Sequence, residues 1–137
     1  MNVLLSIKPR FADAIFSGRK KYEYRRSFTR KAGVQTVFVY SSREVGKLTG
    51  FFNVAEVIRE KPESLWSMSS KHAGISEKEF YDYFNGCSLG YAIKIRDCKR
   101  FKEPLDPYEI IPGFTPPQSF RYLEESACRM MTRQNPE

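Results

Sequence analysis

Short runs of β-branched and aromatic residues alternate along this chain with helical segments of only a few turns. Five runs have the composition of β-strands, and they span residues 2–7, 20–26, 34–40, 50–58 and 89–95. Three segments between them have the spacing of helices, and they span residues 9–17, 62–71 and 76–85. Several strands follow one another without a helix, so the order favours a small mixed β-barrel of the α+β class over a doubly wound parallel sheet.

Two of the helical segments carry start and stop signals. Pro9 stands near the start of the first helix and Gly18 just past its end, which is the usual placement of these two residues at helix termini. The third helix is expected to begin at Ser76, because Ser76 and Glu79 form the Ser-x-x-Glu pattern of a capping box. Both helices are therefore short.

The composition of the sequence changes after residue 100. Five of the eight prolines fall between Pro104 and Pro117, where neither a β-ladder nor a long helix is expected to persist. We therefore expect residues 1–100 to form the barrel and residues 101–137 to form an extension that packs on it within the same domain. This extension is predicted to end in a short helix that begins near Gln118 and includes Leu123.

The positive charge of the chain is concentrated near its amino end. The 137 residues include 23 basic and 16 acidic side chains, for a formal net charge of +7. Residues 8–31 contain nine basic and two acidic residues, and the remainder of the chain has fourteen of each, so this segment holds all of the excess. Such a cluster predicts a local anion-binding surface, and the alternative is a solvated basic face that maintains solubility.

The remaining composition excludes several classes of protein. The three cysteines form no Cys-x-x-Cys pair and His72 is the single histidine, so we expect neither a disulfide framework nor a metal site, and no cofactor. No apolar run approaches the roughly 18 residues of a membrane span. The first residues also lack a secretory signal, so a cytoplasmic protein without membrane association is expected.

A motif near the amino end carries a family resemblance. Gly18, Lys20, Glu23 and Arg25 spell G-x-K-x-x-E-x-R directly after the strand and helix of LLSIKPRFADAIFSG. This arrangement resembles the signature of the ASCH domain, a member of the PUA-like superfamily that also includes the EVE and YTH domains. The resemblance covers residues 2–100 and implies a PUA-like barrel with short helices at its openings. It also implies a basic cleft beside the motif that takes RNA or a modified nucleoside.

The motif side chains have distinct chemical roles to offer. Lys20 suits phosphate binding as a point charge, and the cations Arg19, Lys21 and Arg25 beside it are expected to lower its pKa toward that of a general base. Glu23 and Arg25 lie two apart on one strand face, so they present an acceptor and a donor fork to a base edge or to each other. The alternative is a purely structural Glu–Arg pair that closes one end of the barrel.

Further candidate ligand-binding residues lie near the motif or at strand and helix ends. Lys8 follows the first strand, Ser41 ends the third, His72 follows a helical run, and Gln118 places an amide in the proline-rich arm. The full predicted set is Lys8, Lys20, Lys21, Glu23, Arg25, Arg26, Ser41, His72 and Gln118, without metal ligands.

Three classes of function compete for this site. The first is a binding module for RNA or a nucleotide-like ligand. The second is a hydrolase of modified nucleosides or a metal-independent ribonuclease, with Lys20 as base and Glu23 as acid–base partner. The resemblance implies a threonine nucleophile in the acylcytidine amidohydrolase branch of the family, and Glu23 stands at that position here. The third is a regulatory domain whose basic segment meets an acidic protein. Oligomeric state is not predicted.

Overall fold

The computed structural model describes residues 1–135 and contains six strands and several short helices. In chain order these elements are β1 (Asn2–Ile7), α1 (Pro9–Phe16), β2 (Tyr22–Arg25), β3 (Thr36–Ser41), β4 (Lys47–Glu60), α2 (Pro62–Ser69), the 3-10 helix η1 (Ser70–His72), α3 (Glu77–Tyr83), β5 (Gly90–Leu105), α4 (Pro107–Ile110), β6 (Arg121–Leu123) and α5 (Glu125–Gln134). None of the helices described is long and apolar enough to cross a membrane.

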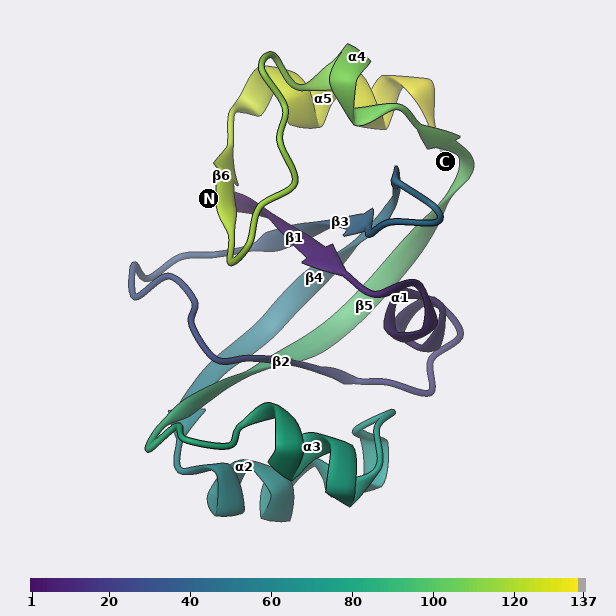
Figure 1. Cartoon of the computed structure of the whole chain (residues 1–137). Helices are drawn as coiled ribbons and strands as arrows, with labels where there is room; N and C mark the ends of the chain where they lie inside the picture. The colour runs from purple at the N-terminus through teal and green to yellow at the C-terminus, as the bar shows by residue number, and fades with distance from the viewer. Residues whose placement is uncertain (136–137) are drawn as a thin grey trace.

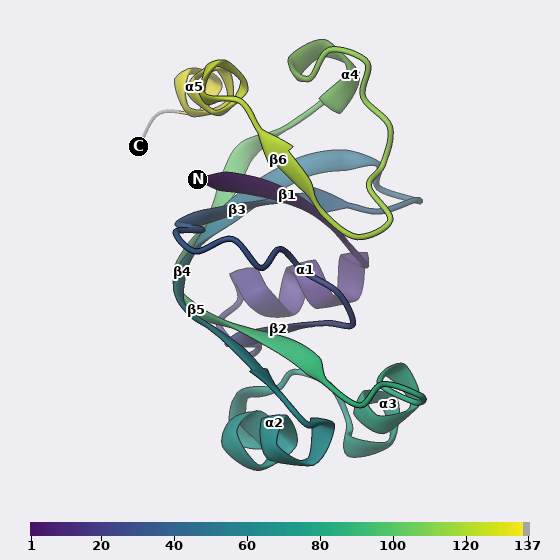
Figure 2. The ribbon, with the colours of Figure 1, turned by 90° about the vertical axis from the view of Figure 1, so that its left-hand side faces the viewer.

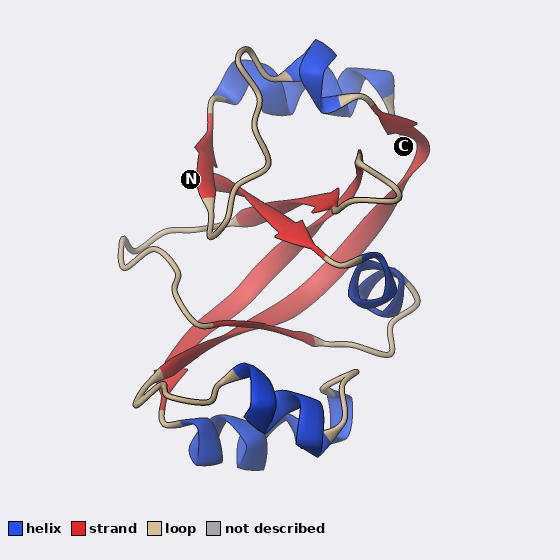
Figure 3. Ribbon diagram, in the orientation of Figure 1, coloured by secondary structure: helices blue, strands red, loops and turns tan. Residues whose placement is uncertain are grey.

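One sheet contains all six strands, in the order β2-β5-β4-β3-β1-β6 (Figure 3). β1 and β3 are parallel, and the other neighbouring pairs are antiparallel. The predicted α+β class is confirmed. The sheet curves as a barrel does, but within residues 1–135 no ladder joins β2 to β1. β6 pairs with Asn2–Leu4 at the start of β1 and leaves the end of β1 facing β2. The barrel therefore has an open seam between β1 and β2.

Helix α1 lies inside the curve of the sheet, between β1 and β2 (Figure 2). Its buried residues Ala12 and Ile15 pack with Val3, Leu5 and Ile7 in one hydrophobic cluster. The intervening Leu4 belongs to a different cluster on the opposite face of the sheet. β1 is therefore buried on both faces, which explains why its sequence is a continuous apolar run and not an alternating one.

Each end of the curved sheet carries its own pair of helices (Figure 1). At one end α2 and α3 bury Leu65 and Phe80 together with Tyr24 of β2. At the other end α4 and α5 bury Ile110 and Met131 against the far side of β1 and β3. The predicted capping box of α3 is confirmed, since the Ser76 hydroxyl accepts the N–H of Glu79 at 3.1 Å.

Two predictions for the carboxyl-terminal third are wrong. β5 does not end near residue 95 but continues to Leu105, and it tolerates Pro104 because the β4–β5 register is interrupted between the Gly50–Arg100 and Leu48–Leu105 pairs. The segment 121–123 is strand β6 and not a helix. Its backbone pairs with the edge of β1, and this tertiary pairing overrides the local helical spacing.

Candidate functional site

The open seam of the barrel contains a cavity of about 360 Å³. We call it the seam cavity. Its wall combines the end of β1, one side of α1, strand β2, the α3 end of the molecule and the proline-rich arm. The lining residues are Ser6, Ile7, Lys8, Phe11, Lys20, Glu23, Tyr24, Arg25, Arg26, Ser27, Ile75, Tyr83, Gln118 and Ser119.

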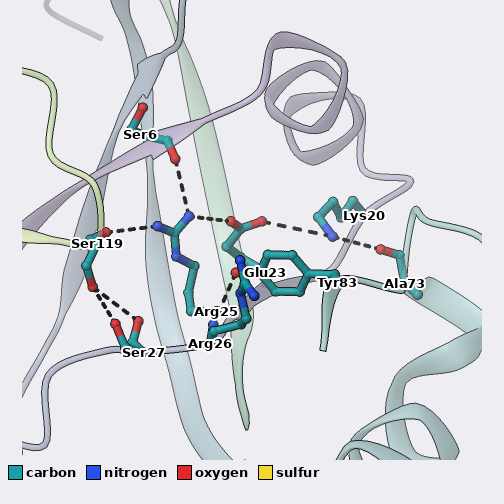
Figure 4. A network of polar contacts seen from close by, with 9 residues as sticks. All are labelled: Ser6, Lys20, Glu23, Arg25, Arg26, Ser27, Ala73, Tyr83 and Ser119. Atoms are coloured by element: carbon teal, nitrogen blue, oxygen red, sulfur yellow. Dashed lines mark hydrogen bonds and ion pairs between the residues drawn. The ribbon is translucent and has the colours of Figure 1, made fainter. Parts of the chain in front are cut away.

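Lys20 is a buried residue of the seam-cavity lining, and Figure 4 shows it between Glu23 and Ala73. Its side chain is 2% exposed, and Nζ donates a hydrogen bond to the Ala73 carbonyl at 2.9 Å. The ammonium lies 4.0 Å from Glu23 Oε1 and 4.6 Å from the centre of the Tyr24 ring. The lysine therefore has a carboxylate and an aromatic face as neighbours, and it anchors the loop between η1 and α3.

The pKa of Lys20 is lowered from its ordinary value of 10.5. The main cause is burial, which disfavours the charged form. Glu23 opposes this shift by attracting the ammonium, and Arg10 adds to it by repulsion. The direction agrees with the expectation from sequence, but the expected cause is wrong, because burial and Arg10 lower the pKa and not the three cations nearest in sequence.

Arg25 closes the seam with its guanidinium. Nη1 donates to the Glu23 carboxylate at 3.3 Å and to the Ser6 carbonyl at the end of β1 at 3.2 Å. Nη2 donates to the Ser119 carbonyl of the arm at 2.9 Å. One side chain thus ties β2 to β1 and to the arm where a closed barrel would have a ladder. From the sequence, Glu23 and Arg25 were expected to bind either a base edge or each other. In the structure the two side chains bind each other.

The cavity wall also holds Tyr83, which sequence reasoning missed, beside the predicted Arg26. Tyr83 accepts a hydrogen bond from the backbone N–H of Arg26 at 3.1 Å, and the Arg26 guanidinium lies 5.3 Å from the centre of the Tyr83 ring. Burial raises the pKa of the Tyr83 phenol. In the sequence Tyr83 is one aromatic of an apolar helix face. The signal that could have identified Tyr83 was its hydroxyl, because a hydroxyl on an apolar face requires a polar partner.

The arm contributes a hydroxyl pair at the rim of the seam cavity. Ser119 Oγ and Ser27 Oγ are 2.7 Å apart, and Ser119 Oγ also donates to the Ser27 carbonyl at 3.4 Å (Figure 4). These contacts join residues 92 positions apart in the chain. They place Ser27 at the cavity, whereas the Thr29 hydroxyl is hydrogen bonded to Tyr122 outside it.

The structure brings six of the nine predicted ligand-binding residues to the seam cavity. The other three lie elsewhere: Lys21 and His72 are exposed and joined by a 2.8 Å backbone hydrogen bond, and Ser41 is buried at the end of β3. We leave these three out of the site. The six that line the cavity are Lys8, Lys20, Glu23, Arg25, Arg26 and Gln118.

Metal-ligating side chains do not gather at the cavity. Glu23 is the single carboxylate among its lining residues, and it is occupied by Lys20 and Arg25. Across residues 1–135 no three His, Cys, Asp or Glu side chains are grouped to hold an ion.

Comparison with known proteins identifies relatives over nearly the whole chain. An "ASCH domain-containing ribonuclease" from Zymomonas mobilis is 32% identical over 134 residues, which cover 93% of this chain and 88% of that protein. A protein named large ribosomal subunit protein uL22 from Ureaplasma parvum is 27% identical over 124 residues, and the match spans 39% of its length.

Solved structures agree with this relationship. The crystal structure of ASCH from Zymomonas mobilis superposes with a TM-score of 0.89 at 30% identity, covering 96% of this chain and 94% of that one. The N-terminal domain of Staphylothermus marinus McrB has a TM-score of 0.64 at 9% identity, so the likeness extends to fold alone. The model of the ASCH domain family matches residues 5–132. The chain therefore belongs to the ASCH domain family.

Proposed function

We propose that this protein binds RNA and holds one nucleotide unit of it in the seam cavity. The observation that carries the proposal is the convergence of Lys20, Glu23 and Arg25 in one concave site with the exposed cations Lys8 and Arg26 at its rim. The volume of about 360 Å³ suits a small polar ligand, since ligand pockets run from about 300 to 1,000 Å³.

The cations of the site have two different roles in binding. Lys20 and Arg25 are occupied by protein carbonyls and by Glu23, so they set the shape and potential of the cavity. Lys8 and Arg26 are exposed and form no ion pair within residues 1–135, so they are available to phosphates. The amide of Gln118 supplies both a donor and an acceptor for a base edge.

The relative from Zymomonas mobilis supports an RNA ligand, because it is named as a ribonuclease and aligns over 93% of this chain. Its name also supports a second candidate function, which is cleavage of the bound RNA. The structural observation in favour of cleavage is the position of Lys20 Nζ, 4.0 Å from Glu23 Oε1 in the cavity, and burial lowers the pKa of this ammonium.

Cleavage would follow the ordinary chemistry of the ribose 2′-hydroxyl. A base in the cavity, Lys20 or Glu23, removes the hydroxyl proton, and the oxygen attacks the adjacent phosphorus. The bond from phosphorus to the 5′-oxygen breaks, and that oxygen receives a proton from the partner acid. The products are a 2′,3′-cyclic phosphate and a free 5′-hydroxyl.

The binding proposal is tested by salt dependence with a matched pair of variants. Lys8 and Lys61 both precede a proline that opens a helix, and their backbone angles are nearly the same. Lys61 does not line the seam cavity. We expect single-stranded RNA of about ten nucleotides to bind more weakly as salt rises from about 50 to 200 mM. Lys8→Gln should make the slope of log K against log salt shallower by about 0.7, while Lys61→Gln leaves it unchanged. Affinity of the unmodified protein that stays flat with salt would end the proposal.

The same RNA separates binding from cleavage. Labelled RNA is incubated with the protein in the presence of a chelator, and its fragments are resolved on a gel. Fragments ending in a cyclic phosphate that disappear in Lys20→Met support the cleavage reading. Intact RNA with retained salt-sensitive binding supports the binding module alone.

A further inference from the structure

A second hollow lies along the loop that joins β2 to β3. Its volume is about 490 Å³, and it is lined by residues 28–34 of this loop, by residues 54–57 and 59 of β4, and by Tyr91 of β5. We call it the loop groove. Arg26 and Ser27 line the seam cavity, and the residues that follow them line the loop groove. One continuous stretch of chain therefore borders both hollows.

The loop groove is positively charged. Arg30, Lys31 and Arg59 line it, all three are exposed, and none has a carboxylate within ion-pair distance in residues 1–135. Glu56 is the single acidic residue of the lining, and Lys94 stands opposite it in the β4–β5 register. The three cations outnumber this one carboxylate, so the groove has a net attraction for anions.

Aromatic rings lie beneath these cations. The Arg59 guanidinium is 5.8 Å from the centre of the Tyr91 ring, and Lys31 Nζ is 5.0 Å from the centre of the Tyr122 ring. Phe28 and the apolar Val54 complete the floor. Tyr91 and Phe28 are buried, at 7% and 5% exposed, and Tyr122 does not line the groove. The rings therefore support the cations, and the groove offers charge for phosphates but no surface on which bases could stack.

The loop that presents the charges is held in place. The Thr29 hydroxyl is hydrogen bonded to that of Tyr122, and the N–H of Lys31 donates to Thr29 Oγ1 at 3.1 Å. At the start of the loop the Ser27 hydroxyl is paired with Ser119. A ligand therefore meets cations that are already positioned, which reduces the entropic cost of ordering them on binding.

We propose that the loop groove binds the phosphate backbone of the RNA segment that flanks the nucleotide in the seam cavity. The inference rests on the proposed function, because it assigns a path to the same ligand. It goes beyond that function by assigning the RNA a second contact surface outside the seam cavity. The occupant is inferred to be RNA and not an acidic protein segment because residues 26–34 run without a break from the seam cavity into the groove.

The test compares a long and a short ligand. The triple variant Arg30→Gln/Lys31→Gln/Arg59→Gln is titrated with single-stranded RNA of about ten nucleotides and with a single ribonucleoside monophosphate. We expect the monophosphate to bind as it does to the unmodified protein. The long RNA should bind more weakly, with a slope of log K against log salt that is shallower by about 2 for three lost phosphate contacts. The double variant Arg30→Gln/Lys31→Gln gives the same test, with a change of about 1.4, without altering the sheet.

A second triple variant controls for net charge. Arg43, Lys47 and Lys102 are exposed, lie outside both hollows and lose the same charge when replaced by Gln. Figure 1 shows the β3–β4 turn, which carries Arg43 and leads into Lys47, on the opposite side of the molecule from the β2–β3 loop. This control should bind long RNA nearly as the unmodified protein does.

Three results overturn the inference, and they are distinguishable. Unchanged binding of long RNA by the groove variant removes the groove and leaves the seam cavity as the proposed site. If the groove variant binds a poly-glutamate peptide more weakly than the unmodified protein does, but binds long RNA equally well, the groove is assigned to acidic proteins instead. If the unmodified protein binds neither the long RNA nor the monophosphate, the proposed function is wrong, and the inference is wrong with it.

Discussion

The inner wall of the seam cavity and the loop groove use positive charge in opposite ways. In the inner wall Lys20 and Arg25 have side chains 2% and 12% exposed, and each donates to backbone carbonyls while sharing Glu23. In the loop groove Arg30 and Arg59 are exposed and without an ionic partner in residues 1–135. Buried cations that are already satisfied maintain the shape of a site, and exposed cations without partners provide its affinity.

The largest effect that tests this contrast is expected from Glu23→Gln. The change preserves the size of the side chain but removes the counter-charge of two cations, which remain buried. Breaking a buried ion pair from one side costs about 3–5 kcal/mol, so the free energy of unfolding should fall by about 3 kcal/mol in denaturant titrations.

Glu56→Gln is the matched control from the loop groove. Glu56 is exposed, so its replacement should change the free energy of unfolding by no more than about 0.5 kcal/mol. Equal losses in the two variants would mean that burial does not distinguish the inner wall from the groove.

A smaller effect, and one that depends on pH, is expected from Lys20→Met. At neutral pH the variant should lose about 1–2 kcal/mol, because the buried Ala73 carbonyl is left without its donor. The pKa of Lys20 in the folded protein is below the value of 10.5 in the unfolded chain. Between these values the unfolded chain binds more protons, so the stability of the unmodified protein relative to Lys20→Met should rise as pH increases toward 10.5 and be lost as pH falls through the folded pKa.

Denaturant titrations from about pH 8 to about pH 10 measure this difference. The upper limit of about pH 10 avoids the ionisation of Tyr24. Burial raises the pKa of Tyr24 from 10.0 to about 12, so the fold loses stability as pH rises between these two values. Lys61→Met, an exposed lysine replaced in the same way, controls for the change of side chain. A flat difference for Lys20→Met would contradict the lowered pKa.

The same contrast explains which parts of the site were predictable from sequence. Lys20, Glu23 and Arg25 lie within six positions and form a motif, so local spacing was enough to group them. Tyr83 and Ser119 reach the site across 57 and 92 positions, and no local pattern contains that information. Lys21 and His72 had suitable chemistry, but Lys21 lies just before β2, His72 is the last residue of η1, and both side chains are exposed.

The fold shows a similar division. The amino-terminal strand and helix and the capping box of α3 depend on local signals, and they were predicted correctly. The extent of β5 past Pro104 and the strand identity of β6 depend on pairing partners elsewhere in the chain. The open seam also depends on distant contacts, because Arg25 of β2 reaches the Ser6 carbonyl at the end of β1 where no ladder joins the two strands.

The smallest effect on stability is expected from Arg26→Gln, at the boundary between the two regions. The hydrogen bond from this residue to Tyr83 uses the backbone N–H, so it survives the substitution, and only the exposed guanidinium over the ring is lost. The free energy of unfolding should change by no more than about 0.5 kcal/mol. RNA affinity should nevertheless fall, with a salt slope shallower by about 0.7, because a phosphate loses its cation. A loss of stability as large as that of Lys20→Met would instead place Arg26 with the buried residues that hold the cavity together.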